Sequence, residues 1–386
     1  MAQVQGQCHP AFSSLKAIFE QYLASGEELG ADISVNIAGE TVVELWGGYT
    51  DVSKSKPWTQ DTLTPVWSVS KIITNLAALL LIDRGQLDPY AKVAQYWPEF
   101  AEGGKRDIEV RHLLSHTAGL PAWDPPLLRE DFLNVPLATE KLIQQQPWWT
   151  PGTTSGYHLV SQGNLVGEVV RRVSGKSLAQ FIRDELSSPL DADYHLGLPE
   201  VDWPRTADVV PPPPIPGLDQ LPPDSIPVRA FRGTLPNATE CMTPEFRRAE
   251  LGASGGFGNA RAINRIVSMV SMGGTVNGRR FLSPESIDLI FKEQVSGVDL
   301  VLGSFLRFGM GMALPAPENP GLDFIPQGRV CYWGGWGGSI AIMDVDRKVT
   351  ITYTMNKMGN GTLGNGRTGE YVKAVYAALD AYQPSS

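Results

Sequence analysis

The chain has 386 residues, of which 42% are hydrophobic and 19% charged, and its formal net charge is −9. This balance indicates a folded globular protein with a large core in one or two lobes. Acidic and basic residues are interspersed without a basic stripe, which excludes nucleic acids and anionic membranes as expected partners. The three cysteines, Cys8, Cys241 and Cys331, are too far apart to suggest a disulfide framework or a metal centre, so we interpret them as reduced thiols.

The sequence carries no pattern typical of export or membrane insertion. Residues 1–10 lack the basic and apolar regions of a secretory signal. The longest apolar run, around Leu76 to Ile82, is far shorter than the roughly 20 residues that a membrane span needs. We therefore expect a cytoplasmic protein without membrane contact.

Helix and strand patterns recur at both ends of the chain. Helical periodicity covers 12–25 and 369–382, and paired β-rich runs cover 31–38 with 41–47 and 339–344 with 348–355. Strands near both termini, each beside a helix, favour one antiparallel sheet built from the two chain ends. The expected fold class is therefore α/β in the mixed α+β sense, with helices flanking the sheet.

The middle of the chain is mostly helical in pattern. Helical periodicity covers 108–115, 137–146, 162–174, 178–186 and 259–272. The proline-rich segment 204–236 is expected to form neither helix nor central strand, and to wrap the surface or cover something. We predict an α/β lobe of residues 1–88 plus 250–386 and an inserted, mostly helical lobe of residues 89–249. The active site is expected in the cleft between the two lobes.

A hydroxyl and an amine lie three residues apart at the start of an apolar helical pattern. Ser68 and Lys71 follow an extended run, 63–67, and precede the helical run 72–82. Residues three apart share a helix face, so the Lys71 amine is expected within reach of the Ser68 hydroxyl. A neutral lysine there can take the serine proton, as in Ser-x-x-Lys acyl-enzymes.

Two other segments carry residues suited to such a site. Tyr157 follows a turn-rich run, where its phenol could shuttle protons in a cleft or could serve only in packing or helix capping. The glycine-rich run from Trp333 to Ser339 leads into a strand and allows a ligand close to the backbone, although the same glycines suit a tight turn or bulge.

Five segments, in order along the chain, resemble the serine β-lactamase and penicillin-binding-protein superfamily. The resemblance is to the branch that holds class C β-lactamases, family VIII carboxylesterases and lovastatin-type acyltransferases. The segments are Trp67 to Lys71, Arg111 to Leu120, Pro151 to Tyr157, Gly252 to Phe257 and Trp333 to Gly335. The string from His112 to Leu120 is especially typical of this branch.

The resemblance implies a role for each matching residue. Ser68 would be the nucleophile, Lys71 its base partner and Tyr157 the relay that passes a proton to the leaving group. The backbone N–H groups of Ser68 and Trp336 would form the oxyanion hole, and the substrate contacts would be Trp333, Gly334, Gly335 and His158. No metal or organic cofactor is implied. Which of Lys71 and Tyr157 is the main base stays open.

The chain departs from its β-lactamase relatives at two positions. Tyr157-His158-Leu159 stands where they have Tyr-x-Asn, and Trp333-Gly334-Gly335 stands where they have Lys-Thr-Gly. The Asn would contact a β-lactam side-chain amide and the Lys its carboxylate. Losing both groups disfavours β-lactams and favours uncharged, bulkier acyl substrates.

Rival patterns point to other sites. Gly252 to Gly256 fits the Gly-x-Ser-x-Gly elbow around Ser254, but no strand-like run precedes Ser254 and no histidine follows it. We expect Ser254 in a loop that lines the cleft. His112 and His116 have the i, i+4 spacing of metal ligands, but no third ligand suggests itself. His158 could tune Tyr157, touch substrate or point into the structure, and Ser70 could orient Lys71.

The resemblance and the residues together imply a serine hydrolase that cleaves carboxylic esters through an acyl-Ser68 intermediate. The expected partner is a small-molecule ester or acyl donor with a hydrophobic portion. An acyltransferase acting on a small-metabolite alcohol in a biosynthetic pathway, a β-lactamase or D-amino-acid peptidase, and a non-catalytic binding member are the alternatives. The sequence does not give the number of subunits.

Overall fold

The computed structural model describes residues 3–215, 217–232 and 237–382. It has a nine-stranded antiparallel sheet in the order β1-β3-β2-β14-β13-β12-β11-β10-β9. The strands at one end come from the start of the chain: β1 Gln5–Cys8, β2 Gly30–Ile37 and β3 Glu40–Gly48. The others come from its last third: β9 Val295–Val298, β10 Phe305–Phe308, β11 Ala313–Leu314, β12 Val330–Gly334, β13 Ile340–Asp344 and β14 Val349–Met355.

The two halves of the sheet meet where β2 pairs with β14. All seven residues of β14 pair with β2, from Val349 opposite Ile37 to Met355 opposite Ala31. The hairpin between β2 and β3 turns at Ala38 and Gly39, both with positive φ, one residue earlier than the sequence predicts. The predicted sheet built from both chain ends is thus confirmed, and β9 to β12 are strands that the periodicity did not show.

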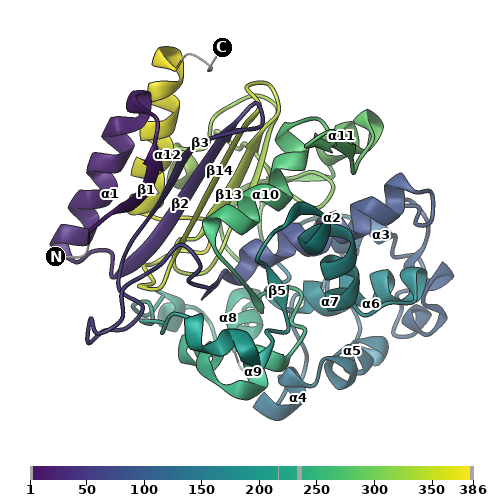
Figure 1. Cartoon of the computed structure of the whole chain (residues 1–386). Coiled ribbons are helices and arrows are strands. Elements are labelled where there is room, and N and C mark those ends of the chain that lie inside the picture. Colours follow the sequence, from purple (N-terminus) through teal and green to yellow (C-terminus); the bar gives the residue numbers. More distant parts are fainter. Residues whose placement is uncertain (1–2, 216, 233–236, 383–386) are drawn as a thin grey trace.

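Helices cover both faces of this sheet (Figure 1). The terminal helices α1 Ser13–Ser25 and α12 Gly366–Ala378 pack together on one face, and α10 Ala260–Ser271 lies against β2, β13 and β14 on the other. The last helix begins three residues before the predicted 369 and ends at Ala378, where a 3-10 turn over Leu379–Ala381 follows. This layering gives the core its position between the sheet and its two helical covers.

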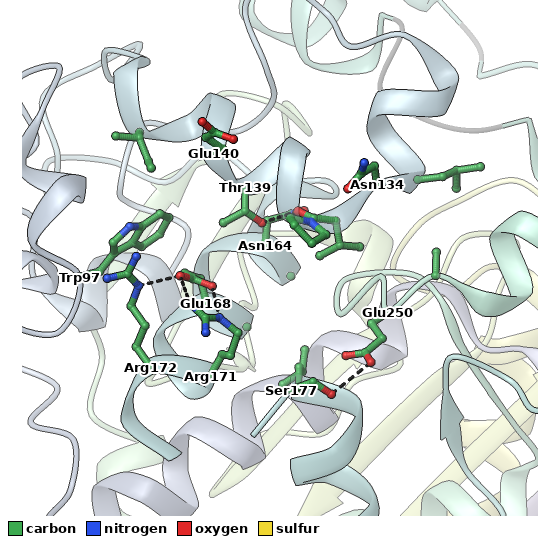
Figure 2. A pocket seen from close by; sticks show the side chains of 18 of the residues that line it. Trp97, Asn134, Thr139, Glu140, Asn164, Glu168, Arg171, Arg172, Ser177 and Glu250 are labelled. Atoms are coloured by element: carbon green, nitrogen blue, oxygen red, sulfur yellow. Dashed lines mark hydrogen bonds and ion pairs between the residues drawn. The ribbon is translucent and has the colours of Figure 1, made fainter. Parts of the chain in front are cut away.

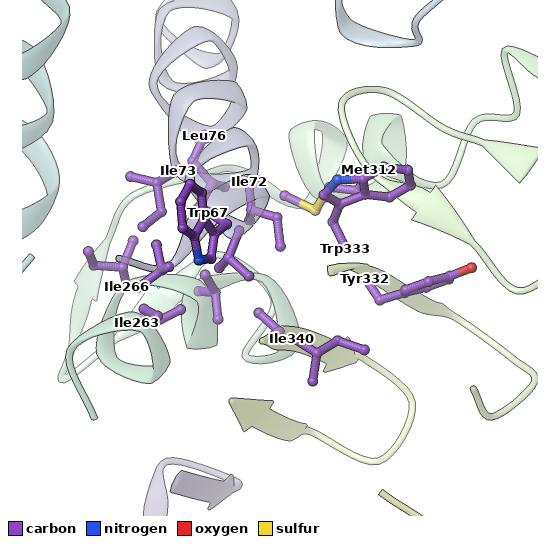
Figure 3. Close-up of a cluster of buried hydrophobic side chains, with 14 of the residues drawn as sticks. Trp67, Ile72, Ile73, Leu76, Ile263, Ile266, Met312, Tyr332, Trp333 and Ile340 are labelled. Atoms are coloured by element: carbon purple, nitrogen blue, oxygen red, sulfur yellow. The ribbon is translucent and has the colours of Figure 1, made fainter. Parts of the chain in front are cut away.

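The buried core extends from the sheet into α2 Ser70–Asp83, the helix that begins just after Ser68 (Figure 3). In α2 the residues from Ser70 to Leu81 are all buried. Ile73 of this helix points to the same side as Ile266 of α10, and both belong to one apolar cluster with Trp67. Because both flanks of α2 are packed, the first turn of the helix is held firmly in place.

The middle of the chain forms a group of helices beyond α2 (Figure 1). They are α3 Val110–Leu114, α4 Arg129–Leu133, α5 Val135–Gln144, α6 Ser161–Ser174 and α7 Leu178–Ile182, which continues as a π-helical turn over Arg183–Ser187. The predicted helix 108–115 is shorter at both ends, Val110–Leu114, because the chain leaves the helical conformation at Ser115. The two-lobe division at residues 88/89 and 249/250 stays a prediction.

A small sheet joins this helical group to the segment around Ser68. It has three antiparallel strands in the order β4 Thr64–Pro65, β6 Gly256–Gly258 and β5 His195–Leu196. β4 leads directly towards Ser68, so the pairing fixes the approach to the nucleophile from a second direction. The hairpin of β7 Thr275–Val276 and β8 Arg279–Arg280 and the helix α11 Pro284–Ile290 complete the C-terminal part.

The proline-rich segment corrects one expectation. It was expected to contain no helix, yet α8 Ile226–Phe231 lies within it, with Pro227 in the first turn, where a missing N–H costs no hydrogen bond. A 3-10 turn, Glu200–Arg205, also includes Pro204. The helix α9 Pro244–Arg248 follows. Residues 216 and 233–236 of the segment lie outside the described residues.

Within the described ranges, no helix combines the length and the apolar character that crossing a bilayer requires. Cys8, Cys241 and Cys331 are free thiols.

Candidate active site

Ser68 lies in a 3-10 turn, Trp67–Val69, between β4 and α2. The backbone of Trp67 has a φ of 52°, a left-handed conformation that a bulky side chain adopts only under strain. The strained residue turns the chain sharply from strand to helix. Ser68 is thereby set at the amino-terminal end of α2, where the helix dipole favours negative charge.

The amine of Lys71 is buried and has three polar neighbours. Its Nζ lies 3.2 Å from Ser68 Oγ, 2.7 Å from the carbonyl oxygen of Leu159 and 3.0 Å from that of Ala253. The contact with Ser68 has the geometry that the Ser-x-x-Lys spacing predicts. Burial lowers the pKa of Lys71 well below that of a free lysine, because the charged form loses its hydration.

Tyr157 completes the group around Ser68. Its ring centroid lies 4.7 Å from Lys71 Nζ, and its hydroxyl accepts a hydrogen bond of 3.1 Å from Trp333 Nε1. Burial raises the pKa of the phenol above its usual value, although hydrogen bonds with Ser68 and Trp333 act in the opposite direction. Tyr157 is therefore a neutral phenol near pH 7, and its proton is available to a neighbouring oxygen.

The glycine-rich turn after β12 lies directly against the backbone of Ser68. A Cβ atom on Gly335 would come 2.5 Å from the carbonyl oxygen of Val66 and 3.3 Å from Ser68 N, so only glycine fits there. The turn continues through Trp336. In the described part of the chain, the N–H groups of Ser68 and Trp336 have no hydrogen-bond acceptor. Both donors are thus free to bond an oxygen atom beside Ser68.

A narrow cavity opens next to these groups. Its lining residues are Trp67, Ser68, Tyr157, Leu159, Val160, Ile215, Phe231, Ser254, Trp336 and Thr362, and they leave about 30 Å³ for the centre of a water-sized sphere. None of these ten side chains is charged. Ser254 is 6% exposed and its hydroxyl has no partner among the described residues, as expected of a residue that faces a ligand.

Trp336, whose N–H is predicted to bind the oxyanion, lines this cavity. The predicted substrate contacts Trp333, Gly334 and Gly335 do not line it and are buried. Trp333 packs on Tyr157, with ring centroids 4.9 Å apart, and thereby holds the phenol in place. Trp333 and Gly335 thus contact site residues from the buried side, at Tyr157 and at the backbone of Ser68.

His158 points away from the cavity. Its Nε2 accepts a hydrogen bond of 3.1 Å from the N–H of Leu120, and its Nδ1 lies 2.7 Å from the carbonyl oxygen of Gly156. The side chain is fully buried, which lowers its pKa to about 3. Since both ring nitrogens are engaged within the protein, we do not retain His158 among the substrate contacts. It fixes the loop that carries Tyr157.

The three other residues with open roles, Ser70, His112 and His116, also bond within the structure. Ser70 Oγ accepts a hydrogen bond of 3.0 Å from the N–H of Gly256. This bond connects α2 to β6 and does not orient Lys71. His116 Nδ1 accepts a hydrogen bond of 3.1 Å from the N–H of His158, and the ring centroids of His116 and Tyr157 lie 4.9 Å apart. His112 Nδ1 accepts a hydrogen bond of 3.1 Å from the N–H of Glu109. Within the described ranges, no three His, Cys, Asp or Glu side chains gather as metal ligands.

Three positions at the site were not predicted from the sequence. The carbonyl groups of Leu159 and Ala253 hold Lys71, and Asp299 Oδ1 accepts a hydrogen bond of 3.0 Å from the N–H of Tyr157. Asp299 is fully buried and also accepts from the N–H groups of Val301 and Leu302. Carbonyl groups carry no residue-specific signal, and Asp299 lies 142 residues from Tyr157.

A larger and more open hollow of about 750 Å³ lies among α5, α6 and α7 (Figure 2). Its charged groups are largely paired with one another: Glu168 with Arg171 and Arg172, and Glu250 with the Ser177 hydroxyl at 3.1 Å. Ser68, Lys71 and Tyr157 do not line it. Ser68 and Tyr157 line the narrow cavity instead, and Lys71 lies behind it in contact with Ser68.

Comparison with known proteins agrees with this architecture. A family model described as beta-lactamase matches residues 15–375, so the chain belongs to the beta-lactamase family. It is an enzyme of the serine β-lactamase and penicillin-binding-protein superfamily, with the β-lactamase/transpeptidase-like fold.

Individual relatives narrow the class. The chain is 32% identical over 372 residues to the esterase/beta-lactamase LipL of Mycobacterium tuberculosis, covering 92% of this chain and 83% of that protein. A penicillin-binding-protein homologue from Caulobacter crescentus superposes with a TM-score of 0.91 at 34% identity, covering 97% of this chain and all of that one. A family VIII carboxylesterase superposes with a TM-score of 0.88 at 33% identity, with the same coverage. The chain is thus a hydrolase of the esterase/β-lactamase family.

Proposed function

We propose that this enzyme is a serine carboxylesterase that cleaves uncharged esters through an acyl-Ser68 intermediate. The observation that carries the proposal is the set of partners around Lys71 Nζ: two carbonyl oxygens and one hydroxyl. A neutral amine has two N–H bonds and one lone pair. It can donate to both carbonyls and accept the Ser68 proton, which is the arrangement of a general base.

The remaining groups supply the other steps. Ser68 Oγ attacks the ester carbonyl as its proton passes to Lys71, and the N–H groups of Ser68 and Trp336 hold the oxyanion. Tyr157 gives its proton to the departing alkoxide and regains one from Lys71. Water then attacks the acyl group by the reverse relay, which releases the acid and restores Ser68.

The walls of the cavity favour uncharged substrates. No charged side chain lines it, and Trp333 stands where a β-lactamase would have a cation for the β-lactam carboxylate. A carboxylate bound there would lose hydration without gaining a partner. The LipL relative is named as both an esterase and a beta-lactamase. We propose the esterase activity for this chain.

The test is hydrolysis of p-nitrophenyl butyrate by the wild type and by Ser68→Ala, with Ser70→Ala as the matched control. We expect turnover and fluorophosphonate labelling in the wild type and in Ser70→Ala, and neither in Ser68→Ala. Activity that survives in Ser68→Ala would contradict the proposal. Efficient nitrocefin turnover would favour a β-lactamase, and preferential ester formation with an added alcohol would favour an acyltransferase.

A further inference from the structure

A second chamber adjoins the catalytic cavity. It has a volume of about 470 Å³. Seven described residues of the proline-rich segment line it, together with residues 301–304, Asn319, Gly321, Leu322 and the turn 360–364 before α12. Its apolar wall includes Pro213, Leu218, Leu221, Leu302, Leu322 and Leu363. None of the described residues that line it carries a charge.

The chamber and the catalytic cavity share one boundary. Ile215, Phe231, Trp336 and Thr362 line both spaces. Trp336 also carries one of the two free N–H groups beside Ser68. An ester whose carbonyl lies at Ser68 therefore has the chamber directly beyond these four side chains.

The catalytic cavity itself is too small for a large substituent. It leaves only about 30 Å³ for the centre of a water-sized sphere, whereas the chamber leaves about 470 Å³ by the same measure. Any longer group on either side of the ester must leave this space. The chamber offers an adjoining apolar volume that lies within the usual range for small-molecule sites, roughly 300–1,000 Å³.

We infer that the chamber binds an uncharged apolar group of the ester substrate, which makes this enzyme selective for esters with a medium or long apolar portion. The inference rests on the proposed function and adds the substrate class. Burial of apolar surface against the leucines and Phe231 supplies the binding free energy. The proline-rich segment has a role in this arrangement, because prolines present apolar surface without exposing N–H groups that need partners.

The experiment measures kcat/KM for two series of esters with the full-length wild type. One series lengthens the acyl chain of p-nitrophenyl esters from acetate to octanoate, and the other lengthens the alcohol of acetate esters from ethyl to octyl. We expect a rise of roughly two- to fourfold per methylene in one series, as burial of a CH2 group predicts. The series that rises shows whether the acyl or the alcohol group occupies the chamber.

A charged substitution tests the location. Leu221 is 42% exposed and lines only the chamber, so Leu221→Asp can fold while it places a carboxylate beside the apolar group. We expect it to lower the ratio of the longest to the shortest ester by about fivefold or more. Leu128→Asp is the matched control, since Leu128 is 64% exposed and lines neither space, and it should leave the ratio unchanged.

The outcomes separate this inference from the proposed function. If Ser68-dependent hydrolysis of the short esters is present but neither series rises with length, the chamber does not bind the substrate and the inference is wrong. A rise that Leu221→Asp leaves unaltered also overturns it, because the chain then binds elsewhere. The absence of any Ser68-dependent ester hydrolysis would instead reject the proposed function.

Discussion

Two buried lysines in this protein have nearly the same surroundings and different chemistry. Lys71 is 2% exposed and Lys105 is fully buried. Each amine faces an aromatic ring, Tyr157 at 4.7 Å for Lys71 and Phe100 at 5.3 Å for Lys105. Each also has three polar neighbours. Burial and ring contact therefore do not distinguish the proposed catalytic lysine from a structural one.

The third neighbour makes the difference. Lys105 Nζ donates to three carbonyl oxygens, of Glu102, Ile143 and Gln145, at 2.6–2.7 Å. Three acceptors that cannot donate require three N–H bonds, so Lys105 is an ammonium. Burial lowers its pKa to about 8, which leaves it charged at pH 7. At Lys71 a hydroxyl replaces the third carbonyl, and only that lysine can be neutral with all its contacts satisfied.

The largest expected effect comes from replacing the base. Lys71→Met should lower kcat/KM for p-nitrophenyl butyrate by about a thousandfold or more, because the Ser68 proton has no acceptor. The substitution removes the hydrogen bonds of the amine but also the free-energy cost of burying it. The free energy of unfolding should therefore change less than in Lys105→Met. Steady-state kinetics measure kcat/KM, and urea unfolding measures the free energy of unfolding. Lys71→Met with near-normal activity would remove the distinction between the two sites.

Tyr157→Phe makes the ring beside Lys71 equivalent to Phe100 beside Lys105. If the phenol protonates the leaving alkoxide, hydrolysis of an alkyl ester should fall by about a hundredfold. Hydrolysis of a p-nitrophenyl ester should fall much less, because p-nitrophenolate leaves without a proton. Comparison of kcat/KM for the two esters checks this. Equal losses for both would assign Tyr157 a role other than proton donation.

The pH dependence tests the protonation state of Lys71. Only the neutral amine accepts a proton, so kcat/KM should fall by about tenfold per pH unit as the pH drops below the Lys71 pKa. Because burial lowers that pKa, this limb should lie well below the 10.5 of a free lysine. The rate should fall again at high pH only where Tyr157 loses its proton, and burial moves that point to higher pH because it raises the pKa of Tyr157. An acid limb near 10.5 would show a normal, charged lysine.

Lys105→Met should have the smallest effect on catalysis. Three buried carbonyl groups would lose their donor, so the free energy of unfolding should fall by roughly 3 kcal/mol. The activity of the folded enzyme and its pH profile should stay within about twofold of the wild type. Urea unfolding and the pH–rate profile check these outcomes. A shifted acid limb in this variant would mean that Lys105 influences the active site.

Local patterns predicted the elements and the first pair of site residues well. The sheet from both chain ends follows from alternating apolar residues in 31–38 and 348–355, and the contact between Ser68 and Lys71 follows from the three-residue spacing. The alignment of ordered motifs added Tyr157, which lies beside both. The glycine-rich run from Trp333 to Ser339 predicted a close approach or a tight turn, and a Cβ on Gly335 would indeed meet the carbonyl oxygen of Val66.

The direction in which a side chain points, and the residues that surround it, could not be predicted from local patterns. His158 follows Tyr157 in sequence, yet its ring points to Leu120 and away from the cavity. The helix α8 formed where prolines suggested none, since Pro227 occupies the first turn. The chamber wall combines Leu221, Leu302 and Leu363, which no local pattern relates.

The sequence by itself determined that a serine and a lysine would meet at a helix start, and that the chain would resemble serine β-lactamase-like enzymes, because both depend on short-range spacing and residue type. Only the tertiary structure decided the surroundings that support the proposed role of this lysine as a base. Its two carbonyl acceptors come from residues 88 and 182 positions away. Its lowered pKa results from burial, which is a property of the packed chain and not of any segment of it.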